Sequence, residues 1–295
     1  MRKCDITTIG RQINLRNKSI EINMLNETLK VFNDGCYRAG NKSVKTSAID
    51  ILSDVMVILP DDLDKLADID PVTTSNHCKL DCQNVDTFSM VRILKSKGVT
   101  NIIALNLASP VNPGGGVRKG AKAQEEDLCR KSSLLFSLES QAAKVYYDYN
   151  RKANTFMGTS AMMITPTVEI IRDDNGKFLP EPVETSVLTC AAPKLVKGEK
   201  LNMKNYRSLV YNRIGYMLTV LAHQGFKNLV LGAWGCGAYG NDAAIISDLF
   251  KASIVNSKYK GYSYNEVFDS ITFAVLDKTD SQYNFKQFKR NFREM

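Results

Sequence analysis

The sequence lacks the features that mark several large classes of protein. Its seven cysteines are an odd number, and none forms a Cys-x-x-Cys pair, so a zinc ribbon or a thioredoxin-like motif has no support. Only two histidines are present, His77 and His223, neither of them beside a recognisable nucleophile, and no His-Glu-x-x-His metal motif occurs. The scattered cysteines favour free thiols in a reducing cytosol.

Long apolar runs and a leader pattern are missing too. No stretch approaches the ~18 apolar residues of a transmembrane helix, so we expect no contact with a membrane. The first twenty residues begin with basic side chains but hold no apolar core, which argues against a secretory signal. We therefore expect a cytoplasmic protein.

What is present is the composition of an ordinary globular protein. The chain has 295 residues, 44% of them hydrophobic and 24% charged, enough for one large domain or a domain with an extension. The net charge of +8 suits either a nucleic-acid binder or a protein with an anionic substrate. In the basic C-terminal segment, Phe285, Phe288 and Phe292 recur at helical spacing, which predicts a docked helix with a solvated basic face. We therefore do not expect direct nucleic-acid binding.

The first 75 residues form a predicted N-terminal extension, mainly helical, that packs on the core. Ile20–Phe32 has the pattern of a helix, closed by a turn that ends at Gly35. The apolar stretch Ala48–Leu59 fits a strand or a helix equally well. The acidic run 61–70 is interpreted as a loop and short helix, not as a metal site.

From residue 76 to residue 295 the pattern predicts one α/β core. Strands alternate with helices, which is typical of a three-layer domain with a parallel or mixed sheet. The predicted strands are 76–82, 101–109, 160–171, 183–192, 226–234 and 269–277. The predicted helices are 87–98, 122–139, 203–224 and 241–254.

Two glycine-rich turns each follow the carboxyl end of a predicted strand and lead into a helix. The first is Asn112–Glu126, and the second is Gly232–Asp242. In open α/β sheets, ligands bind at this edge of the sheet. Glycine lets backbone N–H groups approach an anion, and the following helix favours negative charge at its N-terminus. Two such loops predict a ligand with a diphosphate.

The second turn also contains a Gly-x-Gly-x-x-Gly pattern, Gly235–Gly240, as in nicotinamide-cofactor domains. That motif normally opens a Rossmann domain and is followed about twenty residues later by an acidic residue. Here the motif lies near the C-terminus, and the corresponding position falls near Lys258–Lys260. We therefore retain the phosphate-binding interpretation and set the dehydrogenase aside.

Gln124–Asp127 places three carboxylates in the first turn of the helix after the first glycine loop. Acidic residues are common there, because they complement the helix dipole. The loop, however, would also deliver these side chains to the far end of a bound diphosphate. Hydrolysis of a glycosidic bond needs a proton for the leaving atom and a base for the incoming water. Glu125 and Glu126, which point about 100° apart on a helix, could serve different steps.

Gly114–Gly116, followed after seven residues by Gln124–Glu126, resembles the signature of poly(ADP-ribose) glycohydrolases, and the surrounding chain resembles their microbial branch. The similarity runs from about Cys82 to Leu276, and the N-terminal helix resembles the helical extension of that branch. It implies a macrodomain-like α/β/α sandwich with a mixed sheet, a monomer, and no cofactor or metal. The partners it implies are ADP-ribosylated proteins or poly(ADP-ribose).

The resemblance also assigns roles to residues. Glu126 would be the general acid/base, and Glu125 would hold a hydroxyl of the distal ribose. The other expected substrate-binding residues lie in the two loops. They are Asn112, Gly114, Gly115, Gly116, Val117, Gln124, Gly235, Cys236, Gly237, Ala238, Tyr239 and Asn241. Tyr239 stands where the family usually has Phe, packed against the reacting ribose.

Three functions stay open at this stage. The protein could hydrolyse the ribose–ribose bonds of poly(ADP-ribose), or remove single ADP-ribose groups from protein side chains, including arginine, with the same carboxylates. It could instead be a non-catalytic ADP-ribose reader. The intact Glu125–Glu126 pair argues against a reader, because binding alone does not require a buried acid.

Overall fold

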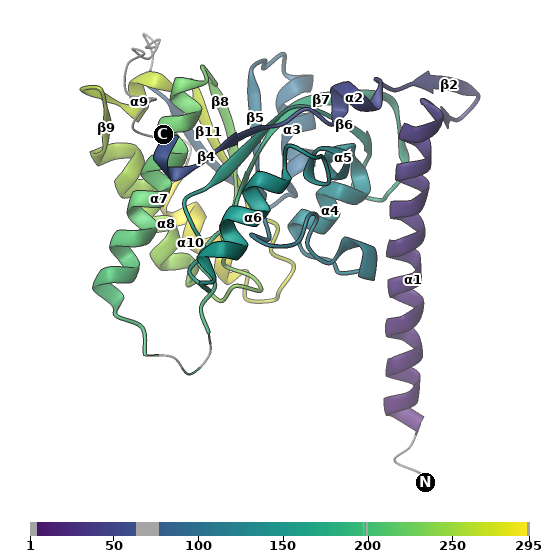
Figure 1. Ribbon diagram of the computed structural model, residues 1–295, viewed down its shortest axis with the longest axis horizontal. Helices are drawn as coiled ribbons and strands as arrows, with labels where there is room; N and C mark the ends of the chain where they lie inside the picture. The colour runs from purple at the N-terminus through teal and green to yellow at the C-terminus, as the bar shows by residue number, and fades with distance from the viewer. Residues whose placement is uncertain (1–4, 63–76, 197, 199, 294–295) are drawn as a thin grey trace.

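A seven-stranded mixed sheet forms the centre of the computed structural model, which describes residues 5–62, 77–196, 198 and 200–293 (Figure 1). In spatial order the strands are β3 (Met56–Ile58), β6 (Met162–Arg172), β7 (Phe178–Cys190), β5 (Ile102–Leu107), β8 (Asn228–Leu231), β11 (Ser270–Ala274) and β4 (Lys79–Gln83). Strand β6 pairs antiparallel with both β3 and β7. The pairs from β7 to β4 are all parallel.

Helices cover both faces of this sheet, which confirms the three-layer prediction (Figure 1). Alternate side chains of one strand point to opposite faces, so Ile103 and Leu105 belong to one core cluster and Ile102 and Ala104 to the other. On the first face lie α7 (Met203–His223), α8 (Ala243–Asn256) and α10 (Tyr283–Asn291). On the second lie α3 (Thr87–Ser96), α4 (Gln124–Lys131), α5 (Leu134–Leu138) and α6 (Lys144–Ala153).

The C-terminal helix docks by its phenylalanines, as predicted. Phe288 and Phe292 are fully buried, and the Phe292 ring stacks on Phe273 of β11 with centroids 4.1 Å apart. Two of the three basic side chains of α10 form ion pairs within the domain: Lys289 with Asp81 at 3.0 Å, and Arg290 with Asp248 at 2.9 Å.

The N-terminal extension does not only pack on the core, because it also contributes a strand to the central sheet. It begins with α1 (Asp5–Asp34), which Figure 1 shows running along one side of the domain, and continues with the hairpin β1 (Cys36–Ala39) and β2 (Lys42–Lys45). The segment Ala48–Leu59, whose pattern fits a strand or a helix equally well, forms one of each: the short helix α2 (Ile49–Leu52) and strand β3. Because β3 pairs with β6, the extension completes the central sheet.

The prediction of one helix over 122–139 is wrong, because α4 and α5 are separate. Between them Ser132 is extended and forms a β-bridge with Ile170, while its hydroxyl donates to the Leu128 carbonyl at 2.8 Å. The next residue, Ser133, exchanges two hydrogen bonds with Glu169. These bonds to β6 compete with helical ones and end α4 after two turns.

The smaller elements are the 3₁₀ turn η2 (Val117–Lys119), the strands β9 (Lys258–Tyr259) and β10 (Tyr262–Ser263), and α9 (Tyr264–Val267). Most of the acidic run 61–70 lies outside the described residues. The six cysteines at described positions are free thiols, as the sequence predicts. Among the helices of the described ranges, none is both long and apolar enough to cross a bilayer.

Candidate active site

A cavity of about 1450 Å³ opens at the carboxyl ends of the parallel strands. Its walls come from the segments that follow strands β5, β7, β8 and β11, and from the N-terminal turn of α4. Both glycine-rich loops contribute to it, as the sequence predicts. The cavity is larger than the roughly 300–1,000 Å³ typical of sites for small ligands.

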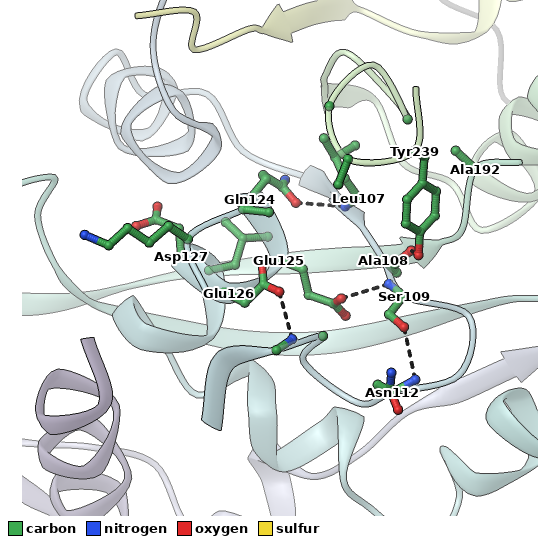
Figure 2. Close-up of a pocket in the computed structure, with 18 of the residues that line it drawn as sticks. Leu107, Ala108, Ser109, Asn112, Gln124, Glu125, Glu126, Asp127, Ala192 and Tyr239 are labelled. Carbon is green, nitrogen blue, oxygen red and sulfur yellow. Dashed lines mark hydrogen bonds between the residues drawn. The ribbon is translucent and has the colours of Figure 1, made fainter. Parts of the chain in front are cut away.

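Gln124 anchors α4 to the end of β5. Its Oε1 accepts the Leu107 N–H at 2.8 Å, and its Nε2 donates to the Leu105 carbonyl at 2.7 Å and to the Thr87 hydroxyl at 3.0 Å. Gln124 lines the cavity, and both ends of its amide bond the protein, so the side chain fixes the position of the two glutamates that follow it (Figure 2).

Glu126 is 7% exposed and has one bonded and one unpartnered oxygen. Its Oε1 accepts the Gly116 N–H at 2.8 Å, so the first glycine loop holds the carboxyl group from below (Figure 2). Its Oε2 is buried and has no hydrogen-bond partner among the described residues. A buried polar atom without a partner is costly, which marks Oε2 as an atom that awaits a ligand.

Glu125 is 3% exposed and points to the other side of the helix turn. Its Oε2 accepts the Ser109 N–H at 2.8 Å, and Asn106 Nδ2 donates to its Oε1 at 3.4 Å. Burial raises the pKa of Glu125 to about 8, with a smaller increase from Glu126, while the bonds from Ser109 and Asn106 oppose the change. Glu125 therefore holds its proton to a higher pH than an exposed carboxyl group does.

The first glycine loop is shaped around these carboxylates. Gly115 has φ +61°, and a Cβ added there would lie 2.5 Å from Glu126 Oε1 and 3.0 Å from Glu125 Oε2. Gly114 has φ +65° and faces the core, where a Cβ would meet the Leu135 side chain. Only glycine fits either position without strain. Gly115, Gly116 and Asn112 line the cavity as expected.

Val117 lies in the first glycine loop, with its side chain turned away from the cavity. Its side chain is 1% exposed and belongs to the core cluster beneath α4, so it supports the loop and does not line the cavity.

Some residues of the second glycine loop line the cavity, and others pack against the protein interior. Gly235, Gly237, Ala238 and Tyr239 line the cavity, and the Tyr239 ring faces the cavity with its hydroxyl 3.4 Å from the Ala108 carbonyl (Figure 2). Burial raises the pKa of Tyr239 to about 12, so the hydroxyl stays protonated.

Two further residues of this loop, Asn241 and Cys236, turn their side chains into the protein. Asn241 is 4% exposed, and its amide bonds the Pro193 and Gly235 carbonyls and the Tyr206 hydroxyl. Cys236 packs on the core with its thiol toward the Trp234 carbonyl. Neither lines the cavity, because the loop turns these side chains toward the domain interior.

Sequence reasoning missed three residues that complete the site. Asn106 and Ser109 hold Glu125, but they belong to a segment whose pattern indicates only a buried strand and its end. Glu21 of α1 bonds Arg130 of α4 and Lys122 before it, both at 2.9 Å, and lines the cavity. In the described part of the chain, no group of three or more His, Cys, Asp or Glu residues is arranged for a metal ion.

Comparisons with known proteins agree on one family. The family model described as the catalytic domain of microbial-type PARG, or poly(ADP-ribose) glycohydrolase, matches residues 25–173. Poly(ADP-ribose) glycohydrolase from Thermomonospora curvata has 27% sequence identity and a TM-score of 0.85, and the match covers 93% of this chain and all of that one. The same enzyme bound to the inhibitor ADP-HPD matches with a TM-score of 0.82 at the same identity and coverage.

The enzyme from Deinococcus radiodurans in complex with ADP-ribose has 31% identity and a TM-score of 0.74. That match covers 84% of this chain and 98% of the other. No functionally curated protein matches the sequence.

Proposed function

Because this chain belongs to the microbial-type poly(ADP-ribose) glycohydrolase family and has its macrodomain-like fold, it is a glycosidase-type hydrolase of ADP-ribose conjugates, and we propose that Glu126 is its general acid/base. The observation that carries the assignment is the unpartnered Oε2 of Glu126, held at the cavity by the Gly116 N–H on the other carboxyl oxygen. The remaining site roles follow from the contacts of the two loops.

The bond to be broken joins C1″ of the distal ribose to the leaving atom. In the proposed sequence, Glu126 gives its proton to that atom as the bond breaks and positive charge develops on the ribose. The ionised Glu126 then takes a proton from the water that attacks C1″, which restores the acid and yields free ADP-ribose. Glu125, fixed by Ser109 and Asn106, holds a ribose hydroxyl close to this centre.

The glycine loops hold the diphosphate in this proposal. Gly115 and Gly116 on one side and Gly237 on the other bring backbone to the cavity surface without side chains between. A Cβ on Gly237 would meet no protein atom within 4 Å, so the space beside it is open to a ligand. The Tyr239 ring covers the reacting ribose and limits access of water.

We also propose that the protein acts as a monomer and does not bind nucleic acid directly. The ion pairs of Lys289 and Arg290 support the second statement, because they occupy two of the three basic side chains of α10 within the domain.

The test is a panel of substrates. The protein is incubated with poly(ADP-ribose) and with arginine-, serine- and glutamate-linked mono-ADP-ribosylated peptides, and free ADP-ribose is measured by chromatography. Release from at least one substrate, abolished in Glu126→Gln, is the expected result. Release from the peptides alone would favour a mono-ADP-ribosyl hydrolase, and tight ADP-ribose binding without any release would indicate a reader.

A further inference from the structure

Phe156 presents an aromatic ring to solvent at the edge of the cavity. It lies between α6 and β6, is 62% exposed and lines the cavity. A large apolar side chain at this exposure buries little area on folding, and its ring is free to meet a ligand in the cavity that it lines.

The turn that carries Phe156 is rigidly built. Arg213, only 1% exposed, donates to the Met157 carbonyl at 2.9 Å and the Gly158 carbonyl at 3.3 Å. The Phe156 carbonyl accepts the Lys194 N–H at 2.9 Å. No acid in the described part of the chain pairs with Arg213, so a costly buried guanidinium serves to hold this turn and the end of β7.

This edge borders the end of the cavity where the reacting ribose is proposed to lie. Arg151 donates to the Val111 carbonyl at 2.6 Å, next to Asn112, and Leu195 donates to the Tyr239 carbonyl at 2.9 Å. The segments that carry Phe156 and Lys194 are therefore tied to both glycine loops. Figure 2 shows Tyr239 and Asn112 on either side of Ser109, toward which Glu125 points.

Thr87, Leu276 and Lys278 also line the cavity, and Gln124 Nε2 donates to the Thr87 hydroxyl at 3.0 Å. In the proposed pose the ribose lies near Asn112, the diphosphate lies between the loops, and the adenosine lies toward these residues. The Phe156 edge is then beyond the ribose, on the side of the leaving group. The cavity volume leaves room for part of that group.

We propose that Phe156 and Lys194 form a subsite for a second nucleotide, the adenosine end of the neighbouring ADP-ribose unit of the polymer. In a ribose–ribose bond the leaving hydroxyl belongs to the adenosine ribose of that unit, so its adenine lies close to the broken bond. The Phe156 ring stacks on this adenine, and the exposed Lys194 ammonium pairs with the following phosphate. The subsite deepens the proposed function and rests on it.

The test compares a ribose–ribose-linked ADP-ribose dimer with a serine-linked mono-ADP-ribosylated peptide, which has no second nucleotide. Phe156→Ala should raise KM for the dimer by roughly tenfold, the loss of one base stack. Lys194→Ala should raise it less and make it less sensitive to salt. Both variants should keep the wild-type rate on the peptide and the wild-type affinity for free ADP-ribose. Phe156→Trp should restore the dimer KM.

Two matched controls lie away from the cavity. Tyr262→Ala removes a 42% exposed aromatic ring, and Lys251→Ala an exposed lysine. Both should behave as wild type on the dimer.

An equal loss of affinity for free ADP-ribose in Phe156→Ala would overturn the subsite, since the ring would then contact ADP-ribose itself. An unchanged KM of Phe156→Ala for the dimer would also overturn the subsite. The same holds for a wild-type enzyme that hydrolyses only the peptide. The proposed function would survive either result. If the wild type released ADP-ribose from neither substrate, the proposed function would fail.

Discussion

Gly115 lies directly against the Glu126 carboxyl group, so that a Cβ at this position would approach Oε1 to 2.5 Å. The same Cβ would also require a left-handed backbone at φ +61°. We expect Gly115→Ala to displace the carboxyl groups and to lower kcat by at least about tenfold, because small misplacements of a catalytic group are costly. Steady-state kinetics check this. An active Gly115→Ala enzyme with normal kcat would show that the loop does not set the carboxylate position.

Gly237→Val probes the diphosphate separately from the carboxylates. The added side chain meets no protein atom and the backbone is not left-handed, so the free energy of unfolding should change by less than about 0.5 kcal/mol. The affinity for ADP-ribose should nevertheless fall strongly, because the side chain occupies the ligand's space. Calorimetry measures both ADP-ribose and adenosine. Equal wild-type affinities for the two ligands would remove the diphosphate argument.

Tyr239 tests the aromatic cover of the ribose. Tyr239→Phe keeps the ring face and loses the contacts of the hydroxyl with the Ala108 carbonyl and Ser109, so a mild effect is expected. Tyr239→Ala should lower kcat more than it raises KM, because a misplaced ribose harms the transition state more than ground-state binding. The two variants are compared on poly(ADP-ribose) and on mono-ADP-ribosylated protein. Wild-type activity in Tyr239→Ala would exclude the role of the ring.

If Tyr239→Phe changes the ratio of the two rates, the hydroxyl contacts the leaving group. If the ratio is unchanged, Tyr is a neutral replacement for the usual Phe.

The raised pKa of Glu125 predicts a pH-dependent stability. Between the unfolded value of 4.5 and the folded value of about 8, the folded state keeps a proton that the unfolded state releases. Stability from this group is thus highest at low pH and falls as pH rises, by up to about 1.4 kcal/mol per pH unit. Urea unfolding of wild type and Glu125→Gln from pH 5 to 8 isolates the effect. The difference between them should shift in favour of Glu125→Gln as pH rises; a constant difference would show an ordinary carboxyl group.

Glu21 links the N-terminal extension to the catalytic helix. Its loss leaves Arg130, which is 3% exposed, without its acid partner, so Glu21→Gln should lower stability by about 1–3 kcal/mol. Asp34→Asn, at an exposed pair on the same helix, should cost at most about 1 kcal/mol. Thermal unfolding of both variants provides the comparison. Equal losses would mean that the Glu21 contact is an ordinary surface pair.

The layered fold and the two loops could be predicted because their signals are local. Apolar runs followed by glycines and then by helical periodicity repeat along the chain, and these patterns depend only on neighbouring residues. The break at Ser132 could not be predicted, because its cause is a bridge to Ile170 on a strand that comes later in the chain.

The sequence predicts those parts of the site that depend on the shape of the backbone. It does not predict those that depend on the direction in which a side chain points. Gly115 and Glu126 stand out in the sequence, but nothing local shows that Asn241 turns inward to bond the Pro193 carbonyl. The support from Asn106 likewise depends on the pairing of strands, and the exposed ring of Phe156 depends on a buried arginine 57 positions away.

The most direct test of the account is the turnover of Glu126→Gln. The variant keeps the carbonyl oxygen that accepts the Gly116 N–H, but it cannot donate and accept the proton that hydrolysis requires. We expect kcat to fall by ~10² or more while the dissociation constant for ADP-ribose, measured by calorimetry on the same sample, stays near the wild-type value. Retention of a substantial fraction of wild-type kcat, with ADP-ribose still bound, would contradict the assignment of Glu126 as the acid/base.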